Sequence, residues 1–449
     1  MVKIIQLFLL LFFISSTSIF GQGLFSSATT KSDSTQTKRA KVEINGYVRG
    51  SGYGGAKNYD LTNVFGEFAL KSKFSSENTF LFADFRVREG VFYNQRDIQF
   101  QLKEAYIGYK GESLDVYAGN QIVSWGRTDG FNPTNSITPN DYFLLTYEPD
   151  DQKMSNFMVR TKYRLNNSID IDLIAIPFYL SSIYRYDLFN IQPGVSYSEI
   201  DLPSSSIKNG SVAARLNFEF PALGFSTSYF NGYDPYYGFQ LKEYSVIPLS
   251  INYAPAPYRK QAAGLDFTLP VRSWIIRGEA AYNITNDYEQ EMYIPNPDIY
   301  YVAGLEKSFF DITAIVQYIG KYTFNFKELT KPSLGGFTQE DFIQYGMEMI
   351  PYESEMYNRK IFNQQEETNH AVMLSLSRSF LYETLRTELS GYYNFTSEEY
   401  FLHGRLEWNI SDNLSTNVGA HYMFGPENSL YNMSGNVLNG VFAGMEVNF

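Results

Sequence analysis

The chain has 449 residues, no cysteine and a formal net charge of −12, which excludes disulfides, thiolate metal sites and cysteine nucleophiles and makes nucleic acid an unsuitable partner. Aromatic residues make up 17 % of the chain, although the mean hydropathy is only −0.27. Beyond residue 21, no apolar run reaches the ~18 residues of a membrane-spanning helix, so a helical membrane protein is excluded.

The N-terminus has the pattern of a signal peptide at residues 1–21. A lysine precedes an apolar run at residues 4–13, and small and polar residues follow. We expect cleavage between Gly21 and Gln22. Residues 22–40 are rich in Ser, Thr and Lys and have few large apolar side chains, which predicts a disordered periplasmic tail.

From residue 41 onward, apolar and polar residues alternate with a period of two, which is typical of strands with one apolar face. The alternation is clearest at residues 81–88, 157–164, 169–175, 212–219, 385–391 and 400–408. Many segments run for ~10–13 residues, the length that a tilted strand needs to cross a bilayer. The pattern predicts that residues 41–449 form an outer-membrane β-barrel.

The connections predict the topology. Short turns are expected near residues 75–78, 111–112, 166–167, 221, 270, 309–310, 381–383 and 410–412. Longer links are expected at residues 53–61, 125–153, 179–208, 233–258, 284–297, 324–367 and 425–436, with brief exceptions near 93–96 and 396–397. Together they predict an all-β, transmembrane, antiparallel up-and-down barrel of about 18 strands (range 16–18), with short periplasmic turns and long extracellular loops.

Two of the long links leave alternatives open. Either residues 233–258 or residues 324–367 could hide a further hairpin. Thr338 and Asp341 precede apolar residues at helical spacing, which predicts a capped short helix in the second link. That helix would either narrow the lumen or cover the barrel from outside.

The glycine-rich residues 50–55 match the dinucleotide-binding pattern G-x-G-x-x-G. No helix pattern follows them, so we interpret them as a hairpin loop.

The most distinctive stretch is residues 102–142, in which two strand patterns lead into a long loop at residues 125–153. Pro133 and Pro139 stiffen this loop, and its Asn and Asp residues favour turns. We expect an ordered loop that folds inward and narrows the pore. The residues predicted to form the constriction are Trp125, Arg127, Asp129, Asn132, Pro133 and Asp141.

The same stretch resembles a family of porin-like Gram-negative outer-membrane barrels of largely uncharacterised function, some of them encoded beside efflux-type transporters. The matching residues are Glu104-Ala105-Tyr106, Gly119-Asn120-Gln121, Trp125-Gly126, Asp129 and Asn132-Pro133. Asn120 stands where the family pattern has arginine. The match covers roughly a tenth of the chain. The resemblance implies a channel or an export barrel, with an envelope transporter as a partner.

The polar face of the strands is expected to line the lumen. The predicted pore-lining residues are Arg86, Arg88, Glu104, Arg160, Lys162, Arg164, Arg215, Arg386 and Arg405. Acidic residues alternate with them. The basic residues would favour anions if they were free, whereas opposing wall charges would hold one another if they were paired, and we prefer the second interpretation.

No catalytic, cofactor or metal site is predicted. His403 and His421, with Ser415 nearby, are the only candidates for a hydrolase, and none of the three histidines has H-x-x-x-H spacing. The preferred function is a porin-like channel for passive passage of small solutes, localised to the outer membrane. An export or lipid-handling barrel is the alternative, and an outer-membrane hydrolase ranks third.

The C-terminal strand indicates how the barrel is assembled. Its apolar row alternates with polar residues and ends at Phe449. Such a row resembles the signal that outer-membrane barrels present to the assembly machinery. The expected partners are therefore outer-membrane lipids, the barrel-assembly machinery acting on this strand, and the envelope transporter that the family resemblance implies, with no nucleic acid.

Overall fold

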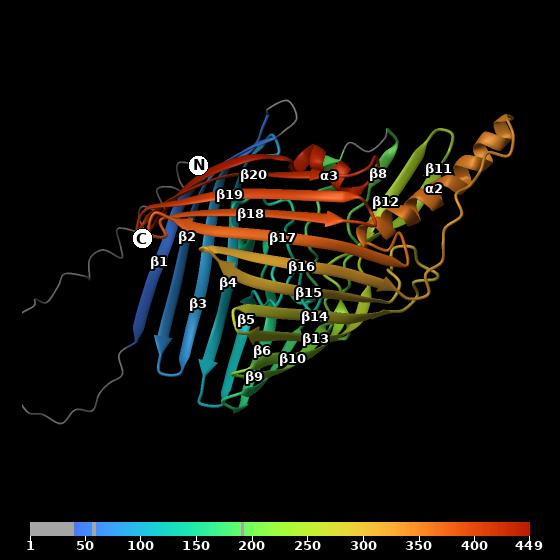
Figure 1. The fold of residues 1–449 in the computed structure, drawn as a ribbon. Helices are drawn as coiled ribbons and strands as arrows, with labels where there is room; N and C mark the ends of the chain where they lie inside the picture. Colours follow the sequence, from blue (N-terminus) through green and yellow to red (C-terminus); the bar gives the residue numbers. More distant parts are fainter. Residues whose placement is uncertain (1–39, 56–59, 190–192) are drawn as a thin grey trace, which may run out of the picture. The chain divides into compact units, whose positions relative to one another are not determined.

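The computed structural model describes residues 40–55, 60–189 and 193–449. Within these residues, eighteen strands form one antiparallel sheet in which each strand pairs with the next (Figure 1). The last strand pairs with the first, from Tyr47 opposite Asn448 to Gly55 opposite Gly440, so the sheet closes into a barrel. The prediction of an all-β barrel with eighteen strands is confirmed. The predicted signal peptide and all but the last residue of the predicted tail lie outside the described residues.

The barrel strands are long at the beginning of the chain and shorter in its middle. They are β1 Lys41–Gly55, β2 Leu61–Ser76, β3 Thr79–Phe92, β4 Gln95–Lys110, β5 Leu114–Gln121, β6 Asn156–Asn166, β7 Ile169–Ile176, β9 Ser211–Phe220, β10 Leu223–Tyr233, β13 Arg259–Val271, β14 Trp274–Thr285, β15 Asp298–Phe309, β16 Ile312–Thr323, β17 Thr368–Phe380, β18 Leu385–Asn394, β19 Glu399–Ser411, β20 Leu414–Phe424 and β21 Gly440–Asn448. The glycine-rich residues 50–55 are the end of β1, so their prediction as a hairpin loop is wrong.

Short turns connect the strands at one end of the barrel, at residues 77–78, 111–113, 167–168, 221–222, 272–273, 310–311, 381–384 and 412–413. Phe310 and Asp311 both have positive φ, 47° and 61°, as a two-residue type I′ turn requires. One predicted turn is displaced. Pro270 lies inside β13, opposite Ile275, and the chain reverses after Val271. Proline is tolerated in a strand where its nitrogen is not needed as a ladder donor.

The longer links lie at the other end. The link between β10 and β13 does contain a hairpin, β11 Gly238–Ser245 and β12 Ser250–Ala256. It pairs with β8 Val195–Tyr197 in a separate three-stranded sheet rather than in the barrel. The barrel therefore keeps eighteen strands among the described residues.

The helix predicted in the longest link is α2, Gln339–Ile361, which has 23 residues and is longer than expected. Thr338 and Asp341 form the capping box at its start, as predicted. Asn358 donates to and accepts from the backbone of Phe239 on β11, so α2 packs on the outer hairpin and projects from the long-loop end (Figure 1). It lies outside the barrel and does not narrow the lumen. No helix in the described residues has the length and apolar character to cross a bilayer.

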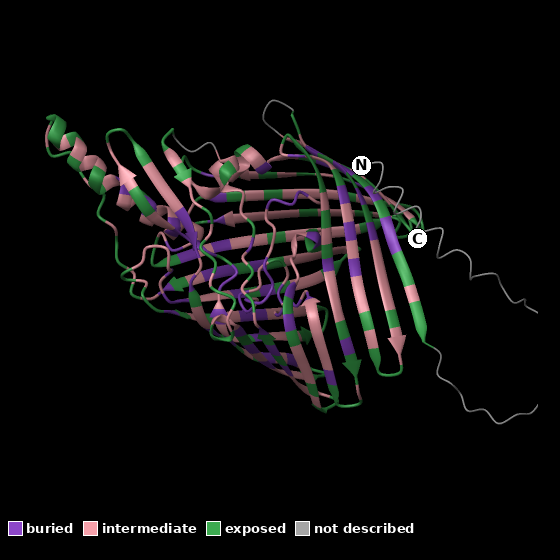
Figure 2. Ribbon diagram, turned by 180° about the vertical axis from the view of Figure 1, so that it is seen from behind, coloured by how far each residue is buried: buried purple, intermediate pink, exposed green. Residues whose placement is uncertain are grey.

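The two faces of the barrel wall differ in polarity. Along the strands, exposed positions alternate with buried ones (Figure 2). The exposed ones include large apolar side chains such as Leu265 and Leu389, whereas Asp266 and Glu279 are buried, with 1 % and 3 % exposure. Exposed aromatic side chains lie near strand ends, among them Trp274, Tyr282, Tyr400, Trp408 and Phe449. An apolar outer face over a polar interior is the arrangement of a barrel that spans a bilayer.

Candidate functional site

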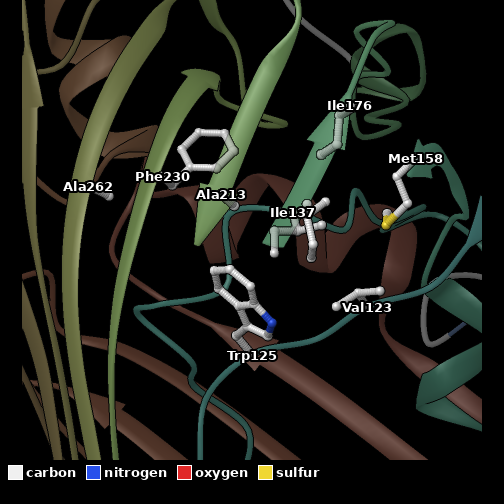
Figure 3. Close-up of a cluster of buried hydrophobic side chains, with 9 residues drawn as sticks. Val123, Trp125, Ile137, Met158, Ile176, Ala213, Phe230 and Ala262 are labelled. Carbon is white, nitrogen blue, oxygen red and sulfur yellow. The ribbon is translucent and has the colours of Figure 1, made fainter. Parts of the chain in front are cut away.

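The link between β5 and β6, residues 122–155, contacts inward side chains of strands far apart in the sheet, such as Glu279 of β14 and Arg49 of β1. It therefore runs inside the barrel, and we call it the inner loop. Val123, Trp125 and Ile137 are almost fully buried in one cluster with wall residues such as Met158 and Phe230 (Figure 3). Thr138 bonds both the N–H and the C=O of Val123 through its hydroxyl, which joins the two limbs of the loop. The burial of these apolar side chains orders the loop against the inner wall of the barrel.

The first part of the inner loop is fixed by Glu279 of β14. This carboxylate accepts hydrogen bonds from the backbone N–H of Arg127, Thr128 and Thr134 at 3.0, 3.3 and 2.8 Å, and from the hydroxyls of Thr128 and Thr134 at 2.9 and 2.8 Å. Gly126 has φ of +114°, and a Cβ there would lie 2.7 Å from a Glu279 oxygen. The Trp-Gly pattern thus places a residue without a side chain where the loop passes the carboxylate.

Charged side chains extend this contact. The Arg127 guanidinium donates to Asp266 of β13 at 2.7 Å and also pairs with Glu219 of β9. Asp129 accepts from Arg277 of β14 at 2.8 Å. We call the contacts of Arg127, Thr128, Asp129 and Thr134 with Glu219, Asp266, Arg277 and Glu279 the first anchor.

The last part of the inner loop is held by arginines of the opposite wall. Asp151, in the 3-10 helix Pro149–Gln152, pairs with Arg49 of β1 and with Arg86 of β3, the latter at 2.5 Å. Burial acts to raise the pKa of Asp151, but the charges of Arg49 and Arg86 hold this pKa below its usual value. Glu148 pairs with Arg405 of β19 at 2.5 Å.

Lys103 of β4 completes this region by donating to the carbonyls of Asp150, Asp151 and Lys153 at 3.1, 2.6 and 2.5 Å. The register between β3 and β4 shifts between Asp84 and Phe85, so Lys103 is the extra residue of a bulge and is 3 % exposed. We call the contacts of Glu148, Asp151 and the loop carbonyls with Arg49, Arg86, Lys103 and Arg405 the second anchor.

Eight of the nine residues proposed from the sequence as pore lining lie in ion pairs or hydrogen bonds. Their partners are Asp84 and Asp151 for Arg86, Glu67 for Arg88, Asp172 for Arg160, Asp115 for Arg164, Asp266 for Arg215, Glu388 for Arg386, Glu148 for Arg405 and the N–H of Ile122 for Glu104. Lys162 is half-buried and stands opposite Asp172 in register. These charges therefore have opposite charges or backbone groups beside them.

The predicted constriction residues all lie on the inner loop, but in four places. Trp125 belongs to the buried apolar cluster, and Arg127 and Asp129 belong to the first anchor. The Asn132 Oδ1 lies 3.1 Å from the Thr128 hydroxyl oxygen, and Asn132 and Pro133 border a cavity. Asp141 accepts from the N–H groups of Phe143 and Leu144 and stabilises a turn.

Glu279, Asp151, Arg49 and Lys103 are site residues that the sequence did not mark as such. Glu279 and Arg49 occupy ordinary inward positions of their strands, with the same pattern as many other polar residues. Asp151 lies in a loop, and the bulge at Lys103 reverses the period-two pattern. The sequence offers one indication of the contacts at Asp151, namely the two aspartates at residues 150–151 near the end of the loop, which could pair with inward arginines.

A cavity of about 360 Å³ lies against the inner loop. Its lining includes loop residues 130–133 and the long-loop ends of the strands β13 to β17. Lys260 pairs with Asp234 at 2.7 Å and Lys321 with Asp298 at 3.1 Å in this lining. The cavity is thus a space between the loops at this end and the inner loop.

The hydrolase candidates do not form a catalytic arrangement. His403 and His421 face each other on β19 and β20, and both rings stack on Phe442. Ser415 lies six residues from His421 on the same strand, a separation of roughly 20 Å at ~3.3 Å per residue. In the described residues, no group of three His, Asp or Glu side chains is placed to hold a metal ion.

No protein-family model and no curated protein matches the sequence. Several solved structures share the fold. OccK5 (OpdH) of Pseudomonas aeruginosa has a TM-score of 0.54 and 9 % identity, covering 91 % of this chain and 97 % of that one. OpdK of the same organism, solved with vanillate, has a TM-score of 0.53 and 8 % identity, and the match covers 91 % of this chain and 98 % of OpdK. OccK2 (OpdF) of that organism, in complex with glucuronate, has a TM-score of 0.50 and 8 % identity, and the match covers 91 % of this chain and 97 % of OccK2.

Proposed function

We propose that the protein is an outer-membrane channel for the passive passage of small solutes, narrowed by the inner loop. The observation that carries the proposal is the fixing of this loop at both ends inside a closed barrel. The apolar outer face supports a bilayer as the surroundings. Among the similar structures, OpdK is an outer membrane protein, and OpdK and OccK2 were solved with the small carboxylates vanillate and glucuronate, which also supports a channel.

The two anchors favour a permanent constriction over a movable gate. Withdrawing the loop would remove the hydrogen-bond donors of Glu279 and the Asp151 carboxylate that Arg49 and Arg86 share, leaving these arginines with Glu67 and Asp84 of the wall, and breaking such buried contacts costs several kcal/mol. A loop that opened often would need a matching set of partners elsewhere. The pairing of the wall charges further favours weak charge selectivity, because opposite charges at the wall neutralise one another.

Orientation and assembly follow from the same proposal. The short turns would face the periplasm and the long loops the exterior. Phe449 helps to join the last strand to the first, since its backbone exchanges hydrogen bonds of 3.0 Å with Gly46 of β1. Recognition of the last strand by the assembly machinery predicts that Phe449→Ala reduces the folded barrel in outer-membrane fractions. An envelope transporter as partner is a proposal from the family resemblance alone, tested by copurification after crosslinking.

Single-channel recording tests the function. We expect the refolded mature protein to give a steady conductance in planar bilayers, and deletion of residues 127–141 to raise it. A folded barrel without conductance would contradict the channel and favour the export or lipid-handling alternative. A conductance unchanged by the deletion would contradict the constriction.

A further inference from the structure

The cavity above the inner loop has an aromatic side built from four separate segments. Phe131 of the inner loop stacks on Tyr392 of β18, with ring centroids 5.3 Å apart. The ring centroid of Tyr392 also lies 6.1 Å from that of Tyr431 in α3, Leu430–Leu438. Tyr300 of β15 borders the same cavity, with the Lys321 ammonium 5.4 Å from its ring centre. Such rings offer flat apolar faces to the C–H groups of a ligand.

The rest of the lining is rich in side-chain amides. Six asparagines line the cavity, namely Asn132, Asn135, Asn283, Asn296, Asn363 and Asn369. An amide offers donors and acceptors together, as a hydroxyl does. Among the described residues, Asn135 Oδ1, Asn283 Oδ1 and Asn369 Nδ2 are buried and have no hydrogen-bond partner. Buried polar atoms of this kind are normally satisfied by a ligand or ordered water.

The charges of the lining argue against an acidic ligand. Both ammonium groups are already paired, Lys260 with Asp234 and Lys321 with Asp298. A third carboxylate, Glu399, accepts from the Tyr431 N–H at 2.8 Å and from the Ser397 hydroxyl at 2.7 Å. Carboxylates therefore outnumber ammonium groups, and an anion would have to displace one of the existing pairs.

We propose that this cavity binds a neutral polyhydroxylated solute, such as a mono- or disaccharide, on its way through the channel. The inference rests on the proposed function, because it names the solute class for that pore. The aromatic side packs against the ring faces of the solute, and the amides bond its hydroxyl groups. The volume of about 360 Å³ lies within the roughly 300–1,000 Å³ of small-molecule sites. This solute class differs from the carboxylates of the OpdK and OccK2 complexes.

The test combines bilayer recording with calorimetry on the detergent-solubilised full barrel. Glucose, maltose and glucuronate are added to the long-loop side. We expect maltose or glucose to interrupt the current reversibly and to bind at least about tenfold more tightly than glucuronate. Equal or tighter binding of glucuronate would overturn the inference.

Variants test the two sides of the site. Tyr431→Ala changes α3 and no barrel strand, and Asn283→Ala removes one amide, so both should weaken saccharide binding by about fivefold or more. Tyr382→Ala in a turn at the opposite end and Asn409→Ala on β19 are matched controls that should leave binding unchanged. Binding unchanged by both site variants would overturn the inference.

The failures of the two proposals are distinguishable. Steady conductance without saccharide block or binding would contradict the saccharide site and leave the channel standing. Saccharide binding by calorimetry without any conductance would support the site and contradict the channel.

Discussion

The two anchors of the inner loop achieve the same result with different chemistry. The first anchor centres on one buried carboxylate, Glu279, which receives backbone N–H groups and hydroxyls of the loop. The second anchor reverses these roles, because the loop supplies Asp151 and its carbonyls and the wall supplies Arg49, Arg86 and Lys103. The difference teaches that removing a loop residue is most damaging where it takes away a buried negative charge shared by two wall arginines.

Replacement of Asp151 should therefore have the largest effect. Asp151→Ala removes the buried carboxylate that Arg49 and Arg86 share and leaves Glu67 and Asp84 as their counter-charges. We expect a loss of roughly 3–5 kcal/mol in the free energy of unfolding. Urea unfolding of the barrel in lipid vesicles measures it. Asp150→Ala, at an exposed neighbour, is the control. A loss below 1 kcal/mol would mean that the second anchor does not hold the loop.

Replacement of Glu279 should have the next largest effect. Glu279→Ala leaves the loop N–H and hydroxyl donors without their acceptor, and we expect a loss of roughly 2–3 kcal/mol together with a higher and noisier conductance. Water can replace part of the lost acceptor, which keeps the loss below that at Asp151. Glu279→Gln keeps one acceptor oxygen and should lie between wild type and alanine. If Glu279→Ala had the same conductance and the same low current noise as the wild type, the role of the first anchor would be contradicted.

Replacement of Arg127 should have a smaller effect. Its partner Glu219 is half exposed, so only the pair with buried Asp266 is protected from solvent, and Arg215 remains beside Asp266. We expect Arg127→Ala to cost about 1 kcal/mol and to widen the pore slightly. Single-channel conductance and the same unfolding experiment check both. A loss as large as that of Asp151→Ala would show that the anchors do not differ in the way described.

The smallest effect concerns pH. The pKa of Asp151 is lower in the folded barrel than in the unfolded chain, so its pairs contribute stability above the unfolded pKa of about 4 and lose it only as the pH falls through the lower folded pKa. The stability difference between wild type and Asp151→Asn should stay constant from pH 8 to about pH 5 and shrink only in stronger acid. A difference that already disappeared at pH 6 would contradict the pairing with Arg49 and Arg86.

The sequence predicted the barrel well because alternation and turn chemistry are local. The strand number, the short turns and the capped start of α2 could all be recognised from neighbouring residues. The turn predicted at Pro270 is displaced because a proline can lie in a strand where no ladder donor is needed. The hairpin loop predicted at residues 50–55 is wrong because β1 extends through these glycines.

The site was less predictable because its contacts join residues far apart in the chain. The Trp125-Gly126 pattern drew attention to the loop, but its acceptor Glu279 lies about 150 positions later, where nothing distinguishes it from other inward carboxylates. Lys103 is the extra residue of a bulge, at which the period-two pattern of β4 changes phase. The alternation of the sequence predicts that the charges share a polar face, whereas their pairing depends on the register of the sheet.

Thiol labelling tests most directly whether the inner loop narrows the pore, because the chain contains no cysteine of its own. Asn132→Cys places a single thiol on the loop beside the cavity, and Tyr382→Cys places one on an exposed turn as the control. We expect a bulky thiol reagent to reduce the single-channel current of the Asn132→Cys variant and to leave that of the control unchanged. An unchanged current after complete labelling of Asn132→Cys would contradict the constriction.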